Sequence, residues 1–125
     1  MIGGIGTDIA AVHRFEKWIK NPEMIERFFN EKERSSASSV SAQCQHYAAR
    51  FAAKEAFSKA LGTGITGFGL KDVYITNDSE GKPLLNIEGQ ALSLMKERLG
   101  ECKAFVSLSH EKEYAVAFVI LEKGE

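Results

Sequence analysis

The sequence has only two cysteines, and they lie far apart in a chain of 125 residues. Cys44 and Cys102 form no CxxC pair, so neither a zinc ribbon nor a thioredoxin-type redox site is available. We expect both to be reduced thiols in a cytoplasmic protein, since disulfides are rare in that compartment.

A long apolar run is also missing. The longest, from Tyr114 to Leu121, has eight residues, whereas a helix that spans a bilayer needs about 20. The first residues, Met1 to Gly6, lack the basic start and the long apolar core of a signal peptide. We therefore expect neither a membrane partner nor a targeting segment.

Neither sign of charge is in excess. Sixteen Lys and Arg residues stand against 17 Asp and Glu residues, for a net charge of −1. A general nucleic-acid binder would need a basic excess to neutralise phosphates, so the balance excludes nucleic acid bound through overall charge. It does not exclude a local basic patch.

The remaining composition, 44% hydrophobic and 26% charged, is ordinary for a globular protein. A chain of this length buries roughly two thirds of the surface it exposes when unfolded. We expect a single domain over residues 1–125, with a core that needs no disulfide or structural metal.

Apolar spacing and turn residues predict helices alternating with hairpins. Apolar residues from Ile9 onward recur at helical spacing until Asn21, because the residue before Pro22 avoids helical geometry. A second helix should begin at Pro22, and residues 31–41 should form a solvated connection. Further helices are expected at residues 40–61 and 89–99, and strands at residues 2–9, around 73–75, and at 84–87, 104–109 and 114–121. This order favours an α+β fold, with a mostly antiparallel sheet packed against a long central helix.

The central helix is built largely of alanine, whose small side chain lets another backbone approach closely. Its ionised residues are Arg50, Lys54, Glu55 and Lys59, three basic and one acidic, so that it carries +2 in a chain that is −1 overall. Taken alone, Glu55 and Lys59 form a solvated pair. The alanines around them favour a functional role, because charges on a closely packed helix usually have a partner or a task.

Glycines follow this helix in a GxGxxG pattern from Gly62 to Gly67. A dinucleotide-binding fold is excluded, because that motif needs a strand before it and a helix after it. Two interpretations remain open: Gly62 is a left-handed helix cap followed by a turn, or the loop lets backbone N–H groups approach an anion.

Two further residues could carry chemistry. Asp8 ends the first strand, where it either caps the following helix or joins Glu55 in supplying hard oxygen ligands for Mg²⁺. His110 follows Ser109, and the two point to opposite faces of a strand, which argues against a hydrolase. His110 either donates to an anion or belongs to a structural turn.

Three stretches of the sequence match family signatures in order along the chain. They are residues 6–9 (GTDI) with Arg14 and Phe15, residues 50–64 (RFAAKEAFSKALGTG), and residues 107–110 (SLSH) followed by Ala115 and Ala117. Together they resemble the signatures of bacterial holo-[acyl-carrier-protein] synthases, the short class of the 4′-phosphopantetheinyl transferase superfamily, whose fold we therefore expect. Residues 77–83 also resemble that family's hairpin turn.

The resemblance implies a transfer reaction. The 4′-phosphopantetheine arm of coenzyme A moves to a serine of apo acyl carrier protein, releasing adenosine 3′,5′-bisphosphate, in support of fatty acid biosynthesis. It implies that Asp8 and Glu55 hold Mg²⁺ and that Lys59 contacts the diphosphate. The residues that it implies at the coenzyme A site are Arg50, Phe51, Lys59, Gly62, Gly64 and His110. The general base stays open between Glu55, Lys59 and a water on the metal.

The resemblance also implies partners. The family is typically a homotrimer that shares its nucleotide site between subunits, and residues 114–121 agree, because a strand that is apolar on both faces must be covered on both. Acidic acyl carrier protein would meet a basic face, for which Arg14 and Lys17 are the candidates.

One stretch departs from the family pattern. Family members often carry basic residues shortly before the central helix, but Ser35 to Gln45 contains none, so the group that meets the 3′-phosphate of coenzyme A stays unassigned. Two rival hypotheses also remain: a non-catalytic module of the same fold that binds a nucleotide or a carrier protein, and a purely structural oligomer.

Overall fold

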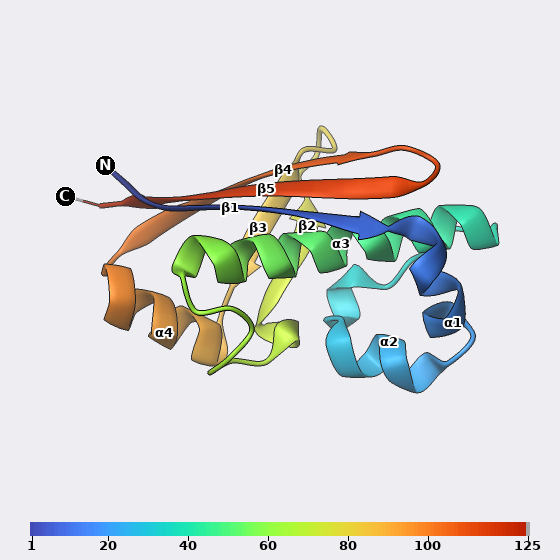
Figure 1. Cartoon of the computed structure of the whole chain (residues 1–125), viewed down its shortest axis with the longest axis horizontal. Helices are drawn as coiled ribbons and strands as arrows, with labels where there is room; N and C mark the ends of the chain where they lie inside the picture. The colour runs from blue at the N-terminus through green and yellow to red at the C-terminus, as the bar shows by residue number, and fades with distance from the viewer. Residues whose placement is uncertain (125) are drawn as a thin grey trace.

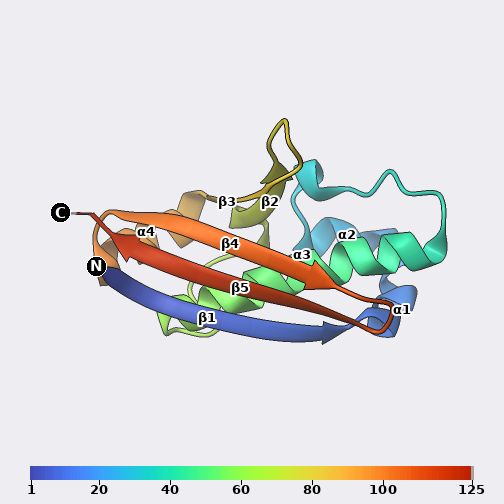
Figure 2. The same ribbon diagram turned by 90° about the horizontal axis from the view of Figure 1, so that it is seen from above.

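A three-stranded antiparallel sheet lies against one long helix in the computed structural model, which describes residues 1–124 (Figures 1 and 2). The strands are β1 (Ile2–Ala11), β5 (Tyr114–Lys123) and β4 (Cys102–His110), in that order across the sheet. The helix is α3 (Val40–Leu61), and Gly62 ends it in the left-handed conformation at φ 86°. The predicted α+β architecture with a long central helix is confirmed.

Two glycines bring β1 and α3 into close contact. A Cβ on Gly4 would lie 1.9 Å from the carbonyl oxygen of Ala60, and one on Gly6 would lie 2.0 Å from that of Ala56. The strand and the helix therefore meet backbone to backbone, as the alanine-rich sequence of the helix predicts. Since side chains alternate along a strand, Asp8 points to the same helix-facing side as these two glycines.

The opposite face of the sheet is apolar and exposed. Along β5, Ala115, Ala117, Val119 and Leu121 are buried against α3. The residues between them and their neighbours on β1 and β4 are exposed: Ile5, Ile9, Phe105, Tyr114, Val116 and Phe118. One chain thus covers a single face of this sheet.

The remaining elements surround the central helix. A hairpin of β2 (Val73–Asn77) and β3 (Pro83–Ile87) forms a second, two-stranded sheet beside β4, and α4 (Gly89–Leu99) lies near the glycine end of α3 (Figure 1). Short helices α1 (Glu16–Ile19) and α2 (Pro22–Phe28) lie near its other end. No helix of residues 1–124 is both long and apolar enough to cross a membrane.

The predicted start of the first helix was wrong. The helix was expected from Ile9, but β1 continues to Ala11 because it pairs with β5 as far as the Ala11–Tyr114 partners. A 3-10 turn, Val12–Phe15, follows, and α1 begins only at Glu16. Local apolar spacing cannot reveal this, since the pairing strand lies about a hundred residues away.

The solvated connection expected over residues 31–41 was also partly wrong. It contains a 3-10 turn, η2 (Glu31–Glu33), and Glu33 is buried, with its carboxylate 2.7 Å from the buried ammonium of Lys54. Lys54 therefore adds nothing to the exposed basic surface of α3, and the local charge of +2 does not lie on one face.

Candidate functional site

Asp8, Glu55 and Lys59 meet where β1 passes over α3. Lys59 Nζ lies 3.1 Å from Asp8 Oδ1 and donates a second hydrogen bond to the carbonyl oxygen of Thr7. The side chain of Asp8 is 18% exposed and that of Lys59 is 55% exposed, so the pair stands at the surface with the carboxylate mostly covered. Glu55 lies one helical turn before Lys59 and faces the same strand.

The electrostatics at Glu55 show that the two carboxylates are close. Burial is the largest cause that raises the pKa of Glu55, and the negative charge of Asp8 raises it further. The positive charges of Lys59 and Arg14 lower it. Within residues 1–124, no side-chain hydrogen bond or ion pair engages the carboxylate of Glu55. Two adjacent carboxylates, one of them without a partner, gain from a cation between them.

This donor set suits Mg²⁺. No group of three or more His, Cys, Asp or Glu side chains gathers in the described chain, so a cation here would take only two protein carboxylates. Mg²⁺ is commonly held in that way, with waters and substrate phosphates completing its octahedron. Asp8 and Glu55 therefore fit the predicted metal.

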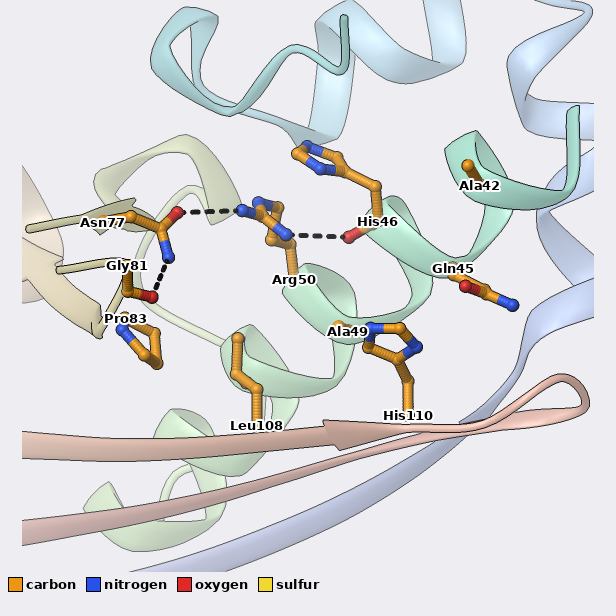
Figure 3. A pocket seen from close by; sticks show the side chains of 10 residues that line it. All are labelled: Ala42, Gln45, His46, Ala49, Arg50, Asn77, Gly81, Pro83, Leu108 and His110. Carbon is orange, nitrogen blue, oxygen red and sulfur yellow. Dashed lines mark hydrogen bonds between the residues drawn. The ribbon is translucent and has the colours of Figure 1, made fainter. Parts of the chain in front are cut away.

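A separate cleft opens on the other side of α3, between that helix, the end of β4 and the turn of the β2–β3 hairpin (Figure 3). Its volume is about 430 Å³. Its lining combines basic, amide and small apolar side chains: Ala42, Gln45, His46, Ala49, Arg50, Asn77, Gly81, Pro83, Leu108 and His110. His110 and Leu108 point into it from the same face of β4, as strand alternation requires.

Arg50 lies across the floor of this cleft. Its guanidinium donates to the carbonyl oxygen of His46 at 3.3 Å and to Asn77 Oδ1 at 3.4 Å, whereas its Nε is buried with no hydrogen-bond partner in the described residues. Burial lowers the pKa of Arg50, which the charge of Glu33 opposes. The half-buried guanidinium can still bind an anion in the cleft through the remaining N–H groups of its terminal nitrogens.

His46 enters the same cleft from the preceding turn of α3. One ring nitrogen donates to the carbonyl oxygen of Glu33. Burial and the neighbouring Arg50 lower its pKa to about 4, so the ring is neutral at physiological pH. Because its single N–H is used on Glu33, the other ring nitrogen can accept one hydrogen bond in the cleft without adding charge.

The other predicted residues lie outside the cleft. Phe51 is 7% exposed and packs in an aromatic cluster with Phe15 and Trp18, with the guanidinium of Arg14 5.0 Å above its ring. Arg14 is exposed and close enough to Glu55 to lower that group's pKa. Lys17 lies exposed on α1.

The glycine loop is also distant from the cleft. Gly62 and Gly64 follow the end of α3, about 18 Å along the helix axis from Arg50 at 1.5 Å per residue. Gly64 adopts φ +65° with open space around its Cα. One chain therefore places the predicted site residues in two regions: Asp8, Glu55 and Lys59, with the glycine loop following on α3, and the Arg50–His110 cleft.

Sequence reasoning missed His46, Asn77 and the Glu33–Lys54 pair. Asn77 was assigned only to a turn, and His46 has no motif around it. A signal for the buried pair was present in the run Ala52-Ala53-Lys54, since a lysine between residues of a packed helix face requires an acidic partner.

Comparison with known proteins shows the family to which the chain is related. The family model described as the 4′-phosphopantetheinyl transferase superfamily matches residues 4–119. A holo-[acyl-carrier-protein] synthase of Treponema denticola is 47% identical over 123 residues, which cover 98% of this chain and 99% of that protein.

Solved structures agree. A holo-(acyl-carrier-protein) synthase from Bacillus anthracis in complex with coenzyme A (3′,5′-ADP) superimposes with a TM-score of 0.82 at 39% identity, covering 99% of both chains. A holo-ACP-synthase from Plasmodium yoelii gives a TM-score of 0.85 at 32% identity, covering 100% of this chain and 98% of its own. The chain therefore belongs to the 4′-phosphopantetheinyl transferase superfamily, within its holo-[acyl-carrier-protein] synthase family.

Proposed function

We propose that this protein transfers the 4′-phosphopantetheine group of coenzyme A to a serine of apo acyl carrier protein. Adenosine 3′,5′-bisphosphate leaves, and the holo carrier protein would serve fatty acid biosynthesis in the cytoplasm. The convergence of Asp8, Glu55 and Lys59 carries this proposal, because it joins a site for a divalent cation to a cation that can reach a diphosphate.

The chain's own residues do electrostatic work in this reaction. Asp8 and Glu55 would hold Mg²⁺, which when bound neutralises charge on the diphosphate. Lys59 is 55% exposed, so its ammonium can leave Asp8 and bind a phosphate oxygen. Phosphoryl transfer depends mainly on positioning and charge stabilisation, so these groups supply what the step requires. The serine proton would go to Glu55, to Lys59 or to a water molecule.

The Arg50–His110 cleft suits the nucleotide end of coenzyme A. Arg50 offers a half-buried guanidinium, and His46 and Asn77 add polar groups beside it. Gly81 and Pro83 provide a narrow wall against which a flat base could lie. Arg50 thereby becomes the candidate for the 3′-phosphate, in place of the basic residues that are absent from Ser35 to Gln45.

The arrangement of the two groups supports a homotrimer with shared sites. Asp8 lies on β1 and His110 on β4, which are opposite edges of the sheet with β5 between them. Coenzyme A could reach both groups if the β4 edge of one copy meets the β1 edge of the next. Such a head-to-tail contact closes into a ring when the rotation allows. The exposed apolar face of the sheet, including Phe105 and Phe118, would be covered in such a ring.

Arg14 and Lys17 would meet the acidic carrier protein. Both are exposed, and Arg14 lies near Glu55, so a carrier docked there would bring its serine close to Asp8 and Glu55. Opposite charges on two partners mainly raise the association rate, so replacing Lys17 should raise KM for the carrier protein most at low salt.

One assay tests the proposed function. The protein is incubated with coenzyme A, Mg²⁺ and apo acyl carrier protein, and the carrier is weighed by mass spectrometry for the phosphopantetheine adduct. Asp8→Ala and Glu55→Ala should abolish the adduct. If the unmodified protein forms no adduct on any of several carriers, the hypothesis of a non-catalytic binding module remains. Full activity in both variants would remove the metal assignment.

A second assay tests the shared site. Asp8→Ala chains and Arg50→Ala chains should each be nearly inactive alone. In an equal, randomly co-assembled mixture, about a quarter of the shared sites would take an intact Asp8 from one chain and an intact Arg50 from its neighbour. Recovery of about a quarter of full activity supports sharing between subunits, and no recovery in verified mixed oligomers contradicts it.

A further inference from the structure

Glu33 and Lys54 form an ion pair in the interior of the protein. Both side chains are fully buried, and Lys54 Nζ lies 2.7 Å from Glu33 Oε1. Lys54 also donates to the carbonyl oxygens of Leu70 and Val73. Glu33 also accepts from the backbone N–H of Asn30 and, through Oε2, from that of Ile75 at 3.0 Å. Both charged groups are thus fully hydrogen-bonded.

These contacts join the two walls of the Arg50–His110 cleft. One wall is α3, whose His46 donates a hydrogen bond to the carbonyl oxygen of Glu33 in η2. The other is the β2–β3 hairpin, and Ile75, which donates to the same Glu33, lies two residues before Asn77 in β2. Arg50 lies between the walls and donates to both (Figure 3). A single buried carboxylate therefore fixes the separation of the two walls.

Stability alone does not account for charges at this position. Burial lowers the pKa of Lys54, and its contacts with Glu33 oppose that effect only in part. An apolar pair of similar volume is often as stable as a buried ion pair or more so. What apolar side chains cannot supply is direction, since each hydrogen bond here sets the place of a backbone segment.

We propose that Glu33 and Lys54 are positioning residues that hold the α3 wall and the hairpin wall of the cleft at the spacing that coenzyme A requires. They set the affinity for its nucleotide end and do not act in the transfer step. This inference rests on the proposed function, which assigns the nucleotide to that cleft. Glu55 is the next residue along the helix after Lys54, but it faces β1 and its side chain has no contact with the pair.

The test uses the neutral pair Glu33→Gln with Lys54→Met in one full-length chain. Lys54→Met alone leaves a buried carboxylate without its partner and is expected to unfold easily. In the double variant no buried charge remains, and the glutamine amide introduced in place of the Glu33 carboxylate can still accept one backbone N–H and donate to one carbonyl. The double variant should therefore melt at a higher temperature than either single variant.

The expected result separates positioning from stability. In the double variant, adenosine 3′,5′-bisphosphate should bind about tenfold more weakly by calorimetry, and KM for coenzyme A should rise to match. The kcat at saturating coenzyme A should stay within about threefold of the unmodified protein, because Asp8, Glu55 and Lys59 are untouched. Met95→Ala, a core truncation on α4 away from the cleft, is the matched control and should lower the melting temperature without changing KM.

Two results would overturn the inference. One is unchanged binding of adenosine 3′,5′-bisphosphate in a folded double variant, and the other is a loss confined to kcat. If the unmodified protein binds neither coenzyme A nor adenosine 3′,5′-bisphosphate, the proposed function fails and the inference fails with it. If the unmodified protein binds and the double variant binds equally well, only the positioning role fails.

Discussion

Replacement of Gly6 by alanine tests whether the contact between β1 and α3 sets the position of the Asp8 carboxylate. A Cβ at Gly6 would lie 2.0 Å from the carbonyl oxygen of Ala56, where ordinary van der Waals contact begins at 3.4 Å. Both atoms belong to backbone or are fixed to it, so no rotamer change relieves the clash. The strand must move from the helix by more than ~1 Å, which for overpacking costs about 1–3 kcal/mol of folding stability.

Asp8 is two residues further along the same face of β1 and would move with the strand. Displacement of a reacting group by about 1 Å can cost about 100-fold in rate. We therefore expect Gly6→Ala to remain folded near 20 °C, to melt several degrees lower, and to lose about 100-fold in kcat in the carrier-modification assay. Saturating Mg²⁺ should recover part of the loss, since the displaced carboxylate would hold the cation more weakly.

Two glycines of the same strand provide controls. A Cβ on Gly3 would meet the flexible side chain of Lys123 at 2.9 Å, so Gly3→Ala should be nearly silent. A Cβ on Gly4 would lie 1.9 Å from the carbonyl oxygen of Ala60, so Gly4→Ala should destabilise as much as Gly6→Ala but with a smaller loss of kcat, because it lies further from Asp8. A Gly6→Ala protein with unchanged melting temperature and kcat would refute the reasoning.

Three further outcomes follow from the structure. Lys59→Met should lower kcat by about 100-fold while Mg²⁺ still binds, and an unchanged kcat in steady-state assays would exclude its role at the diphosphate. Because the pKa of His46 is lowered to about 4 in the fold, only unfolded chains take up its proton between about pH 6.5 and 4, so stability should fall as pH falls through that range. Discounted for partial exposure, the effect is about 1–2 kcal/mol, and His46→Gln should flatten it in pH-dependent melting curves. Phe118→Asp should convert the proposed homotrimer into monomers by light scattering, whereas a monomeric parent protein would contradict the covered sheet face.

The sequence was informative where local signals decide the structure. Alanine content and the glycine cap predicted α3 to its last residue, and turn residues placed the β2–β3 hairpin. Local sequence signals failed where contacts with distant segments of the chain decide the structure. The strand continues through Ile9 because β5 pairs with it, and Glu33 is buried because Lys54, 21 positions later, meets it.

The residues of the candidate site also differ in whether local sequence could identify them. Asp8, Glu55 and Lys59 could be identified from motifs, and the structure brings Asp8 and Lys59 within 3.1 Å. Nothing in the sequence could separate Phe51, which is buried in an aromatic cluster, from Arg50, which opens into the cleft, because adjacent helix positions differ by about 100° around the axis. His46 was missed because its environment depends on Glu33, 13 residues earlier, and not on a motif around it.

The side-chain alternation of β1 also limits how this gene can change. Gly4, Gly6 and Asp8 share the helix-facing side of the strand, and Ile5 and Ile9 share the other. One codon inserted between Gly6 and Asp8 would turn the carboxylate outward and press an isoleucine onto the backbone of α3. A substitution changes one position, whereas a change of length by one residue moves every later side chain of β1 to the opposite face, so relatives should keep the length of this strand.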